Sequence, residues 1–508
     1  MYVLTLLTQA SVSSGGIRFR MNSQTVRRPE NKRPSRSQKP KKYYKQTARF
    51  EGKRDGKPLI FGWGTHLSHN EKVQIQRRAT WITAISVIVL IVAVIIGFWV
   101  NINIIIPSQP ITSVNGHPVP QSLYRKMVAF KTQLAQSSIN GPNGEIAQRD
   151  SMNKQLTNLQ QQLQTLSKQF DAVKKQIAAL KPGPSPERTK LTKQQTDIQT
   201  SGTNLATKYT NLNQQYTNLT KTVIPQDQTN INQSQVGNDS VTWLQNDELI
   251  REWLASQNSQ VQARVNPSAG ALSQAMAAFK ANIPKTSSYS AFLSKDSVSD
   301  DDMQAMMAVT LRRDNMQAYL ASQVVSPTYQ VQARMITLDT QQKATTILNE
   351  LKHGGEFAKL AKANSVDNQT ATKGGSLGWL ARGQYVQNYT AANVEMWLFD
   401  PARKVNELSP IIKENGTFRI VQLMAIDHAR ALDAATMQSL KGSALTNWLT
   451  EQQALPGTVI TPVDQNKLLD AMNMPPDLPA GAPSSGSPSG APGSAPGGIP
   501  GGGVPAQP

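Results

Sequence analysis

The sequence of 508 residues contains no cysteine. This absence excludes disulfides, thiolate nucleophiles and cysteine-ligated metals, although an extracytoplasmic protein can also lack disulfides. Histidine is scarce, with five residues: His66, His69, His117, His353 and His428. They suggest no metal cluster or catalytic triad, so we assign them surface or structural roles and expect neither a metal nor a cofactor. The motif GxxxxGK[ST] is also absent, which excludes a phosphate-binding loop of the usual form.

Charged residues are missing from residues 79–100, "ATWITAISVIVLIVAVIIGFWV". A membrane-spanning helix needs roughly 20 apolar residues, and Trp81 and Trp99 stand at the two ends, where interfacial aromatic residues are expected. The run therefore predicts one transmembrane helix, with a buried helix of a soluble domain as the alternative. A cleaved signal peptide is disfavoured, because a long basic segment precedes the run and no small-residue cleavage site follows it.

Positive charge is concentrated before this run. Residues 1–78 contain 18 Lys and Arg against four acidic residues, which is +14 of the net +20. Because such an excess stays on the cytoplasmic side, we expect a single-pass cell-membrane protein with a cytoplasmic tail and an extracytoplasmic bulk. The tail composition indicates disorder and attraction to anionic lipid. Base stacking on Tyr43 and Tyr44 is an alternative, but we expect no specific nucleic-acid partner. Met21 is an alternative start of translation.

Residues 108–144 predict a short strand, a turn and a helix. The strand covers 111–114, an Asn-Gly turn follows, and Leu123, Met127 and Phe130 lie on one face of the helix. We interpret this segment as the start of a helical domain that continues at residues 239–325.

Residues 145–223 carry hydrophobic residues at alternating spacings of four and three, which is the a/d pattern of a coiled coil. "KPGPSPE" at 181–187 interrupts the pattern, and a seven-residue repeat of leucine and isoleucine follows. We therefore predict an antiparallel coiled-coil hairpin, with an interruption at Ser201-Gly202 in its second arm. The alternative is a disordered linker, because Gln, Asn and Thr are weak helix formers.

Amphipathic helices are predicted across residues 239–325. Ser299 is the expected N-cap of one of them, because three acidic residues follow it. A methionine stripe in the same helix favours core packing, with an adaptable peptide-binding groove as the alternative. Its members are Met303, Met306, Met307 and Met316.

Residues 330–427 predict a compact α+β domain of about 100 residues. We expect a strand at 330–338, one helix at 341–364, a loop at 364–384 with little periodicity, a short helix, and a hairpin-like pair of strands. A final helix is predicted at 434–454. From residue 475 onward the chain is almost wholly Pro, Gly, Ser and Ala, which is typical of a flexible tail.

The segments "GGEFAKLAKANSVD", "GGSLGWLARGQ", "ELSPII" and "TFRIVQL" occur in this order. Together they resemble a parvulin (PpiC-type) peptidyl-prolyl isomerase domain from residue 331 to about 427. The flanking "SVNGHPVPQSLYRKMVAF", the helices at 241–322 and "LTNWL" resemble the chaperone domain of SurA-like and PrsA-like foldases. The implied fold class is α+β. It combines a single transmembrane helix, a helical SurA-like chaperone domain with an inserted coiled-coil hairpin, and a parvulin domain.

The resemblance implies a shallow groove that holds a proline ring. In parvulins the glycine-rich loop wraps the side of this groove, whereas a plain surface loop is the alternative. Tyr385 and Tyr389 stand where the family usually carries Met and Phe of the proline pocket, and Leu377 lines it. These three residues are the expected substrate-binding residues.

The resemblance also implies the catalytic residues. Asp367 stands where the family carries Cys or Asp facing the amide. Met335 and Arg419 replace two histidines of the family, so its paired-histidine hydrogen-bond network is missing. An ion pair between Arg419 and Asp367 would hold the carboxylate ionised.

Two functions follow. The first is a membrane-anchored peptidyl-prolyl cis-trans isomerase that assists secreted proteins, acting on unfolded or nascent polypeptides with X-Pro bonds. The second is a chaperone that keeps the parvulin fold only to bind unfolded clients, which the missing histidines favour. A structural scaffold built on the hairpin is a third class, but it leaves the parvulin-like segments unexplained.

Overall fold

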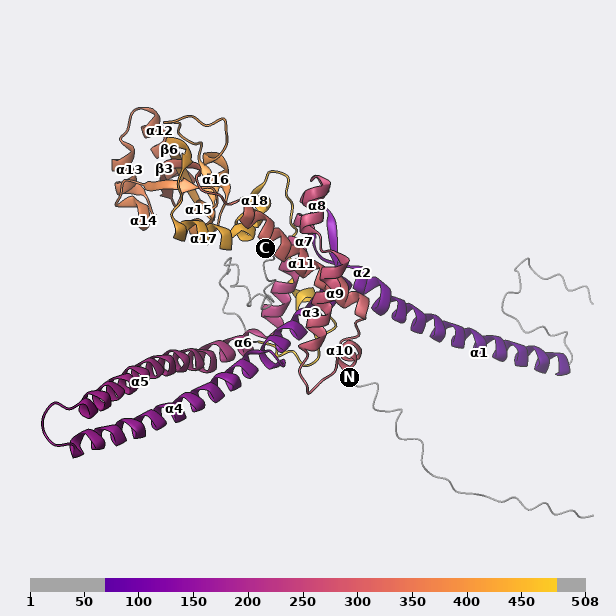
Figure 1. The fold of residues 1–508 in the computed structure, drawn as a ribbon. Coiled ribbons are helices and arrows are strands. Elements are labelled where there is room, and N and C mark those ends of the chain that lie inside the picture. The colour runs from indigo at the N-terminus through magenta and orange to yellow at the C-terminus, as the bar shows by residue number, and fades with distance from the viewer. Residues whose placement is uncertain (1–68, 482–508) are drawn as a thin grey trace, which may run out of the picture. The chain divides into compact units, whose positions relative to one another are not determined.

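The computed structural model describes residues 69–481. Most of the predicted basic tail at 1–78 and most of the predicted flexible tail at 475–508 lie outside the described residues. Within them, the chain forms one long apolar helix, a helical domain with a pair of long helices, and a small mixed α+β domain (Figure 1).

The first helix, α1 (His69–Val100), contains the charge-free run. A π-helical turn, η1 (Asn101–Ile105), and a short α2 (Ile106–Ser108) continue it. The stretch Val73–Ser108 is long and apolar enough to cross a membrane, and none of its most apolar window is buried. Trp81 and Phe98 are each 67% exposed. The alternative of a buried core helix is therefore wrong for this segment.

The helical domain begins with a β-hairpin. Strands β1 (Pro110–Val114) and β2 (His117–Pro120) pair antiparallel. The first of them was predicted, and the second was not. Asn115 and Gly116 have φ of 50° and 86°, the conformation that Asn-Gly hairpin turns favour. The predicted helix follows as α3 (Gln121–Asn140), in which Met127 and Phe130 are fully buried.

Two long helices follow, α4 (Glu145–Ala179) and α5 (Pro186–Asn218), with a second π-helical turn η2 (Leu219–Val223). Figure 1 shows them side by side, joined by the Pro/Gly segment. Their seam is thin, because Leu156 and Val173 are the side chains of α4 that are buried and α5 buries none. Ser201 and Gly202 do not interrupt α5.

The remaining helices of the domain pack around α3. Ser299 caps the last of them through a capping box with Asp302, as the sequence predicts. Such a cap contributes about 1 kcal/mol. The helices are α6 (Ile224–Asn230), α7 (Gln233–Ala255), α8 (Ser259–Val265), α9 (Ala269–Ala281), α10 (Tyr289–Lys295) and α11 (Asp300–Gln323).

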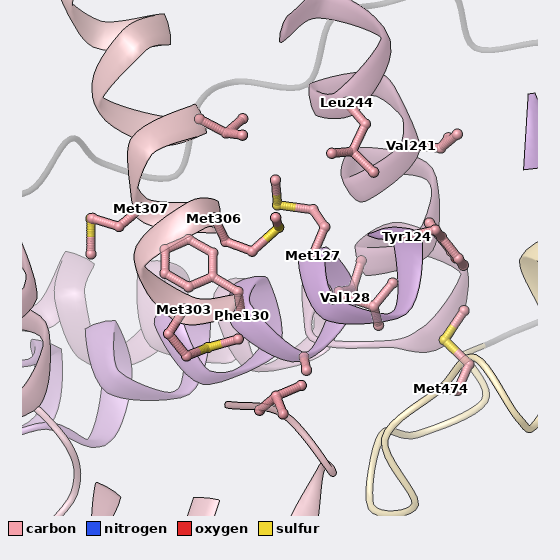
Figure 2. Packing of buried hydrophobic residues seen from close by; sticks show 14 of the residues in the cluster. Tyr124, Met127, Val128, Phe130, Val241, Leu244, Met303, Met306, Met307 and Met474 are labelled. Carbon is pink, nitrogen blue, oxygen red and sulfur yellow. The ribbon is translucent and has the colours of Figure 1, made fainter. Parts of the chain in front are cut away.

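The methionine stripe forms part of the core of this domain. Met303, Met306 and Met307 are at most 2% exposed, and Figure 2 shows them beside Met127 and Phe130 of α3. Met316, fully buried, belongs to a second cluster with α7, α8 and the C-terminal helices. Burying such a side chain stabilises the fold by about 1.5–3 kcal/mol. The interpretation as core is confirmed, and these side chains offer no open groove.

The α+β domain is built on a four-stranded antiparallel sheet with the order β4-β3-β6-β5. Its strands are β3 (Thr328–Leu338), β4 (Ser376–Ala381), β5 (Ile412–Glu414) and β6 (Thr417–Arg430). The alternation of side chains along β3 sends Met335 and Ala333 to one face and Ile336 and Leu338 to the other. The domain therefore has two small cores, one on each face of the sheet.

Each face is covered by its own helices. α12 (Gln341–Lys352) and α13 (Phe357–Asn364) cover the face of Ile336. α15 (Gln384–Tyr389) and α16 (Asn393–Leu398) cover the face of Met335. The one-turn α14 (Asn368–Ala371) precedes β4. Figure 1 shows α12 and α13 on one side of β3 and β6, with α16 on the other.

Two predictions for this domain are wrong. The single helix expected at 341–364 is broken between α12 and α13, because Gly354 adopts φ of 92° and ends the first helix. The loop expected at 364–384 contains α14 and the edge strand β4. Its backbone pairs with β3, and a bulge between Ala333 and Arg334 shifts the register.

The chain then returns to the helical domain. The helix expected at 434–454 is two helices, α17 (Ala434–Gly442) and α18 (Ala444–Ala454), which contact α11. A short α19 (Gln465–Leu468) follows, and the Tyr124 hydroxyl donates to the Leu468 carbonyl over 2.9 Å. The α+β domain is thus an insertion between segments of one helical core.

Gly375 allows a tight contact between β3 and the start of β4. Its φ is +82°, and a Cβ atom there would lie 2.4 Å from the Met335 carbonyl oxygen. We expect Gly375→Ala to destabilise the α+β domain by about 3 kcal/mol, since backbone strain and backbone displacement combine. Urea unfolding of the full chain in detergent micelles measures the change.

Gly378→Ala is the matched control. Gly378 also has a positive φ, +72°, but nothing lies within 4 Å of the added Cβ. It should cost only about 1 kcal/mol. Equal losses in the two variants would show that the close approach to Met335 is unimportant.

Candidate functional site

The candidate site lies on the sheet face that α15 and α16 cover. β3 places Met335 and β6 places Arg419 on this face, where the pairing Thr337↔Arg419 fixes their relative height. α15 carries Tyr385 and Tyr389 on the same side, four residues and about one turn apart. Five of the six predicted residues contact at least one other member of the set through a hydrogen bond, a ring stack or a cation–π contact, and Leu377 packs against the same apolar cluster.

Asp367 is held by hydrogen bonds on both oxygens. Oδ1 accepts the backbone N–H of Gln369 over 3.0 Å, which caps α14. Oδ2 accepts the Thr370 hydroxyl over 2.7 Å and the Tyr389 hydroxyl over 3.0 Å. The carboxylate is thus fixed in orientation at the edge of the tyrosine pair.

Tyr385 and Tyr389 form a stack. Their ring centroids are 4.6 Å apart with an interplanar angle of 23°. Tyr389 is half-buried, whereas Tyr385 is fully buried beneath it. Burial, and next the charge and hydrogen bond of Asp367, raise the pKa of Tyr389, so its hydroxyl stays protonated and donates. A ligand ring can meet Tyr389, and Tyr385 supports it from below.

Arg419 does not form the ion pair with Asp367 that the sequence suggested. Its guanidinium lies 2.5 Å from Oε2 of Glu414, and both side chains are almost inaccessible. The same Glu414 oxygen accepts the Tyr385 hydroxyl over 2.7 Å, and Oε1 accepts the Val394 N–H over 3.3 Å. The difference arises because Glu414, on the neighbouring strand, is buried beside Arg419, while Asp367 is already satisfied.

The charge of Arg419 persists despite its burial. Desolvation lowers its pKa to about 10, which still leaves the guanidinium cationic at neutral pH, and the charge of Asp367 opposes the decrease. The guanidinium carbon lies 4.8 Å from the Tyr389 ring centroid, a distance typical of cation–π contact. Burial raises the pKa of Glu414 to about 7, although backbone N–H groups of Val394 and Asn393 favour its charged form.

Met335 and Leu377 frame the site. Met335 is fully buried, and its sulfur lies 3.6 Å from the Tyr385 hydroxyl. Leu377, on β4, is half-buried and packs against the same cluster. Neither Met335 nor Tyr385 presents a surface to solvent, so any contribution of these two to binding is indirect. Leu377 and Tyr389 supply the accessible apolar side chains.

Sequence reasoning missed two buried acids, Glu414 and Glu395. Glu414 stands next to the Asn-Gly turn of a predicted hairpin, where an acid ordinarily faces solvent. Glu395 lies in α16 and is 1% exposed. Their burial depends on contacts between distant segments, so no local pattern distinguishes them from surface acids.

The arrangement suits non-covalent chemistry. It combines an aromatic face, a fixed carboxylate and a buried cation. Such a site can hold a ring and stabilise a polar amide as its geometry changes.

One group outside this site could hold a metal. Among the described residues, donor atoms of His117, Glu248 and Glu252 lie within 4.8 Å of one another. His117 Nδ1 is 2.6 Å from Glu248, which also pairs with Arg251, and Asn115 donates to Glu252 over 2.6 Å. These contacts already connect the β1–β2 turn to α7, so the group serves a structural purpose as it stands.

A groove of about 560 Å³ lies in the helical domain. α3, α10 and the segment near Pro475 line it, with Phe292, Ile146 and Leu478 as apolar side chains and Lys295 as a charged one. Its volume is in the range of ligand pockets. It is a second accessible surface, separate from the sheet.

The ion pair on the sheet predicts a pH-dependent mutant. Arg419→Met leaves Glu414 as a lone buried acid, so we expect a loss of about 3 kcal/mol at neutral pH. A lone buried acid has a higher pKa in the folded state than in the unfolded chain. The loss of stability therefore becomes smaller as the pH falls toward the pKa of the unfolded chain, because Glu414 then takes up a proton. Urea titrations of the full chain at about pH 5 and about pH 7 measure both values.

Lys343→Met is the control for this experiment. Lys343 pairs with Asp339 on the surface of the same domain, where the two side chains are 60% and 50% exposed. It should lose less than about 1 kcal/mol at either pH. A loss for Arg419→Met that is the same at both pH values would contradict the assignment to Glu414.

Comparisons with known proteins find relatives of the α+β domain. Residues 305–425 match the family model of the PPIC-type PPIASE domain. The periplasmic chaperone PpiD of Buchnera aphidicola is 35% identical over 95 residues, which cover 19% of this chain and 14% of the relative. The foldase protein PrsA of Exiguobacterium sibiricum is 42% identical over 60 residues, covering 12% and 20%. The chain therefore spans at most about a fifth of the length of these two relatives.

Among solved structures, the parvulin domain of PpiD from Escherichia coli is similar to this chain. It shows 29% identity and a TM-score of 0.17, and the match covers 20% of this chain and 93% of that one. The resemblance noted in the sequence is confirmed by the family model and by the named relatives. Residues 305–425 of this chain thus match a PPIC-type parvulin domain.

Proposed function

We propose that the protein is a membrane-anchored peptidyl-prolyl cis-trans isomerase that assists the folding of secreted polypeptides. The match of residues 305–425 to the PPIC-type domain carries the proposal. The fixed carboxylate of Asp367 at the edge of the stacked tyrosines supports it. The names of two relatives, a periplasmic chaperone and a foldase, indicate the same class of activity.

The chemistry requires no nucleophile. Rotation about an X–Pro bond meets a barrier of about 18–20 kcal/mol, because resonance gives the C–N bond partial double-bond character. The planar amide is the charge-separated form, so binding it against Tyr389 and Leu377 with little water removes part of its stabilisation. Groups that favour the twisted amide lower the barrier further.

The chain's own residues divide these tasks. Tyr389 and Leu377 seat the proline ring, and Asp367 faces the amide. Arg419, held by Glu414, places a positive charge under the ring face of Tyr389. This buried ion pair occupies the part of the sheet where the family carries a histidine, and a fixed charge pair can supply polar stabilisation in its place.

The anchor is α1. Its apolar side chains are exposed along the helix, and an uncovered apolar surface of this extent is costly in water. A bilayer covers it. With the basic residues 1–78 on the cytoplasmic side, the parvulin domain acts outside, on unfolded polypeptides with X-Pro bonds.

The isomerase activity is tested with a protease-coupled assay on Xaa-Pro peptides. We expect the full chain in detergent micelles to accelerate exchange. Asp367→Ala and Tyr389→Ala should each lower kcat/KM by about 10–100-fold, since each removes a group that faces the reacting amide.

Asp339→Ala is the control, because Asp339 is an exposed acid of the same domain. It should keep the activity of the parent. If the parent shows only background turnover but suppresses the aggregation of an unfolded client, the isomerase proposal is contradicted. The protein would then be a chaperone that only binds its clients.

The anchor is tested by membrane extraction. The full chain should remain with membranes after alkaline carbonate washing, whereas a chain without residues 79–100 should be released. Protease added to cells whose outer layers have been removed, with the anchoring membrane intact, should digest the parvulin domain. A domain that is digested only after this membrane is lysed would contradict the proposed orientation.

A further inference from the structure

Glu395 is a buried carboxylate that the proposed isomerase chemistry does not use. Its oxygens accept three backbone N–H groups: Gly383 over 2.5 Å, Tyr385 over 3.1 Å and Val386 over 3.3 Å. These groups belong to the first turn of α15, the helix that carries Tyr385 and Tyr389. Glu395 therefore fixes the start of the helix on which the tyrosine stack depends.

The same turn also contacts the C-terminal helices. A Cβ atom at Gly383 would lie 2.7 Å from Nδ2 of Asn447 in α18, so the two segments approach as closely as a glycine allows. Arg382 donates to Glu451 of α18 through two nitrogens, over 3.3 Å and 2.9 Å. The start of α15 thus lies between Glu395 of its own domain and α18 of the helical domain.

Glu451 pairs with Arg382 and also affects the protonation of Glu395. Burial raises the pKa of Glu395 to about 8, and the charge of Glu451 and a hydrogen bond with it add to the rise, while the N–H groups of Gly383 and Val386 oppose it. Arg382 is the cation that faces this pair of acids. A neighbouring acid disfavours the charged form of a buried carboxyl group, so Glu451 favours the protonated form of Glu395.

We propose that Glu395 is a positioning residue for the parvulin site and that Glu451 makes its action depend on the docking of α18. This inference rests on the proposed isomerase function. Glu395 fixes the first turn of α15 and thereby the place of Tyr389 beside Asp367. Because Arg382, directly before that turn, pairs with Glu451 of a helix that belongs to the helical domain, displacement of α18 breaks this pair and frees the turn.

The proton gives the contact a pH dependence with a defined sign. In the folded state Glu395 keeps a proton that it releases in the unfolded chain near the ordinary glutamate pKa of 4.5. The stabilisation is fully present below that pH and is lost as the pH rises through about 8. Above it, two carboxylates face each other with Arg382 as the neighbouring cation, and the contact with α18 weakens.

The test uses the full chain in detergent micelles with Glu395→Gln and Glu451→Gln. Glu356→Gln is the matched control, since Glu356 is an exposed acid of the same domain, paired with Lys359. Hydrogen exchange of the Gly383, Tyr385 and Val386 amides reports the position of α15. The kcat/KM for an Xaa-Pro peptide, from about pH 5.5 to about pH 9, reports the consequence.

We expect the parent to lose kcat/KM and amide protection together as the pH passes about 8. Glu451→Gln, which has no second ionisable carboxyl group but still donates a hydrogen bond, should flatten both profiles. Glu395→Gln should increase the exchange of the three amides and reduce kcat/KM by about tenfold, because a small displacement of a substrate-holding group is costly.

Parent-like profiles in both variants would overturn the inference, as would a change of overall stability without a change of either profile. A parent that shows the pH-dependent amide protection but no isomerase activity would refute the proposed function and leave the positioning role of Glu395 intact.

Discussion

Arg419 carries a positive charge into a sheet face where it is only 6% exposed, and Glu414 makes this burial tolerable. An isolated buried charge costs several kcal/mol, so the guanidinium, the carboxylate and the Tyr385 hydroxyl must stay together. This constraint fixes the height of α15 over the sheet. The stack of Tyr385 on Tyr389, and through it the contact with Asp367, depends on the same arrangement.

The parts of the fold that local chemistry decides were predictable. Ser299 begins a helix because its side chain and the acids after it satisfy free N–H groups, and the Asn-Gly turn at residue 415 joins two expected strands. At residue 115 the turn was expected, but the strand β2 that follows it was not. The strand β4 was not predictable, because its glycine-rich sequence has no strand periodicity and its pairing with β3 supplies the order. The break at Gly354 shows how one left-handed residue divides an otherwise continuous helical pattern.

The site shows the same division. Resemblance places Tyr385, Tyr389 and Asp367 in one neighbourhood, and the structure brings them within hydrogen-bond or stacking distance. The resemblance alone does not show which acid neutralises Arg419, since that choice depends on the depth of two strands relative to each other. Glu414 and Glu395 acquire their roles from burial, which arises only when helices distant in sequence cover them.

The pair α4 and α5 has a mechanical consequence. Both arms are well-formed helices of 35 and 33 residues, about 50 Å each, yet Leu156 and Val173 are the only side chains of the two that are buried. A seam with so little buried apolar area has a low free energy of separation compared with the domain cores. A pulling force from a polypeptide bound to the polar faces of α4 and α5 would therefore separate these two helices first, while the domain cores stay folded.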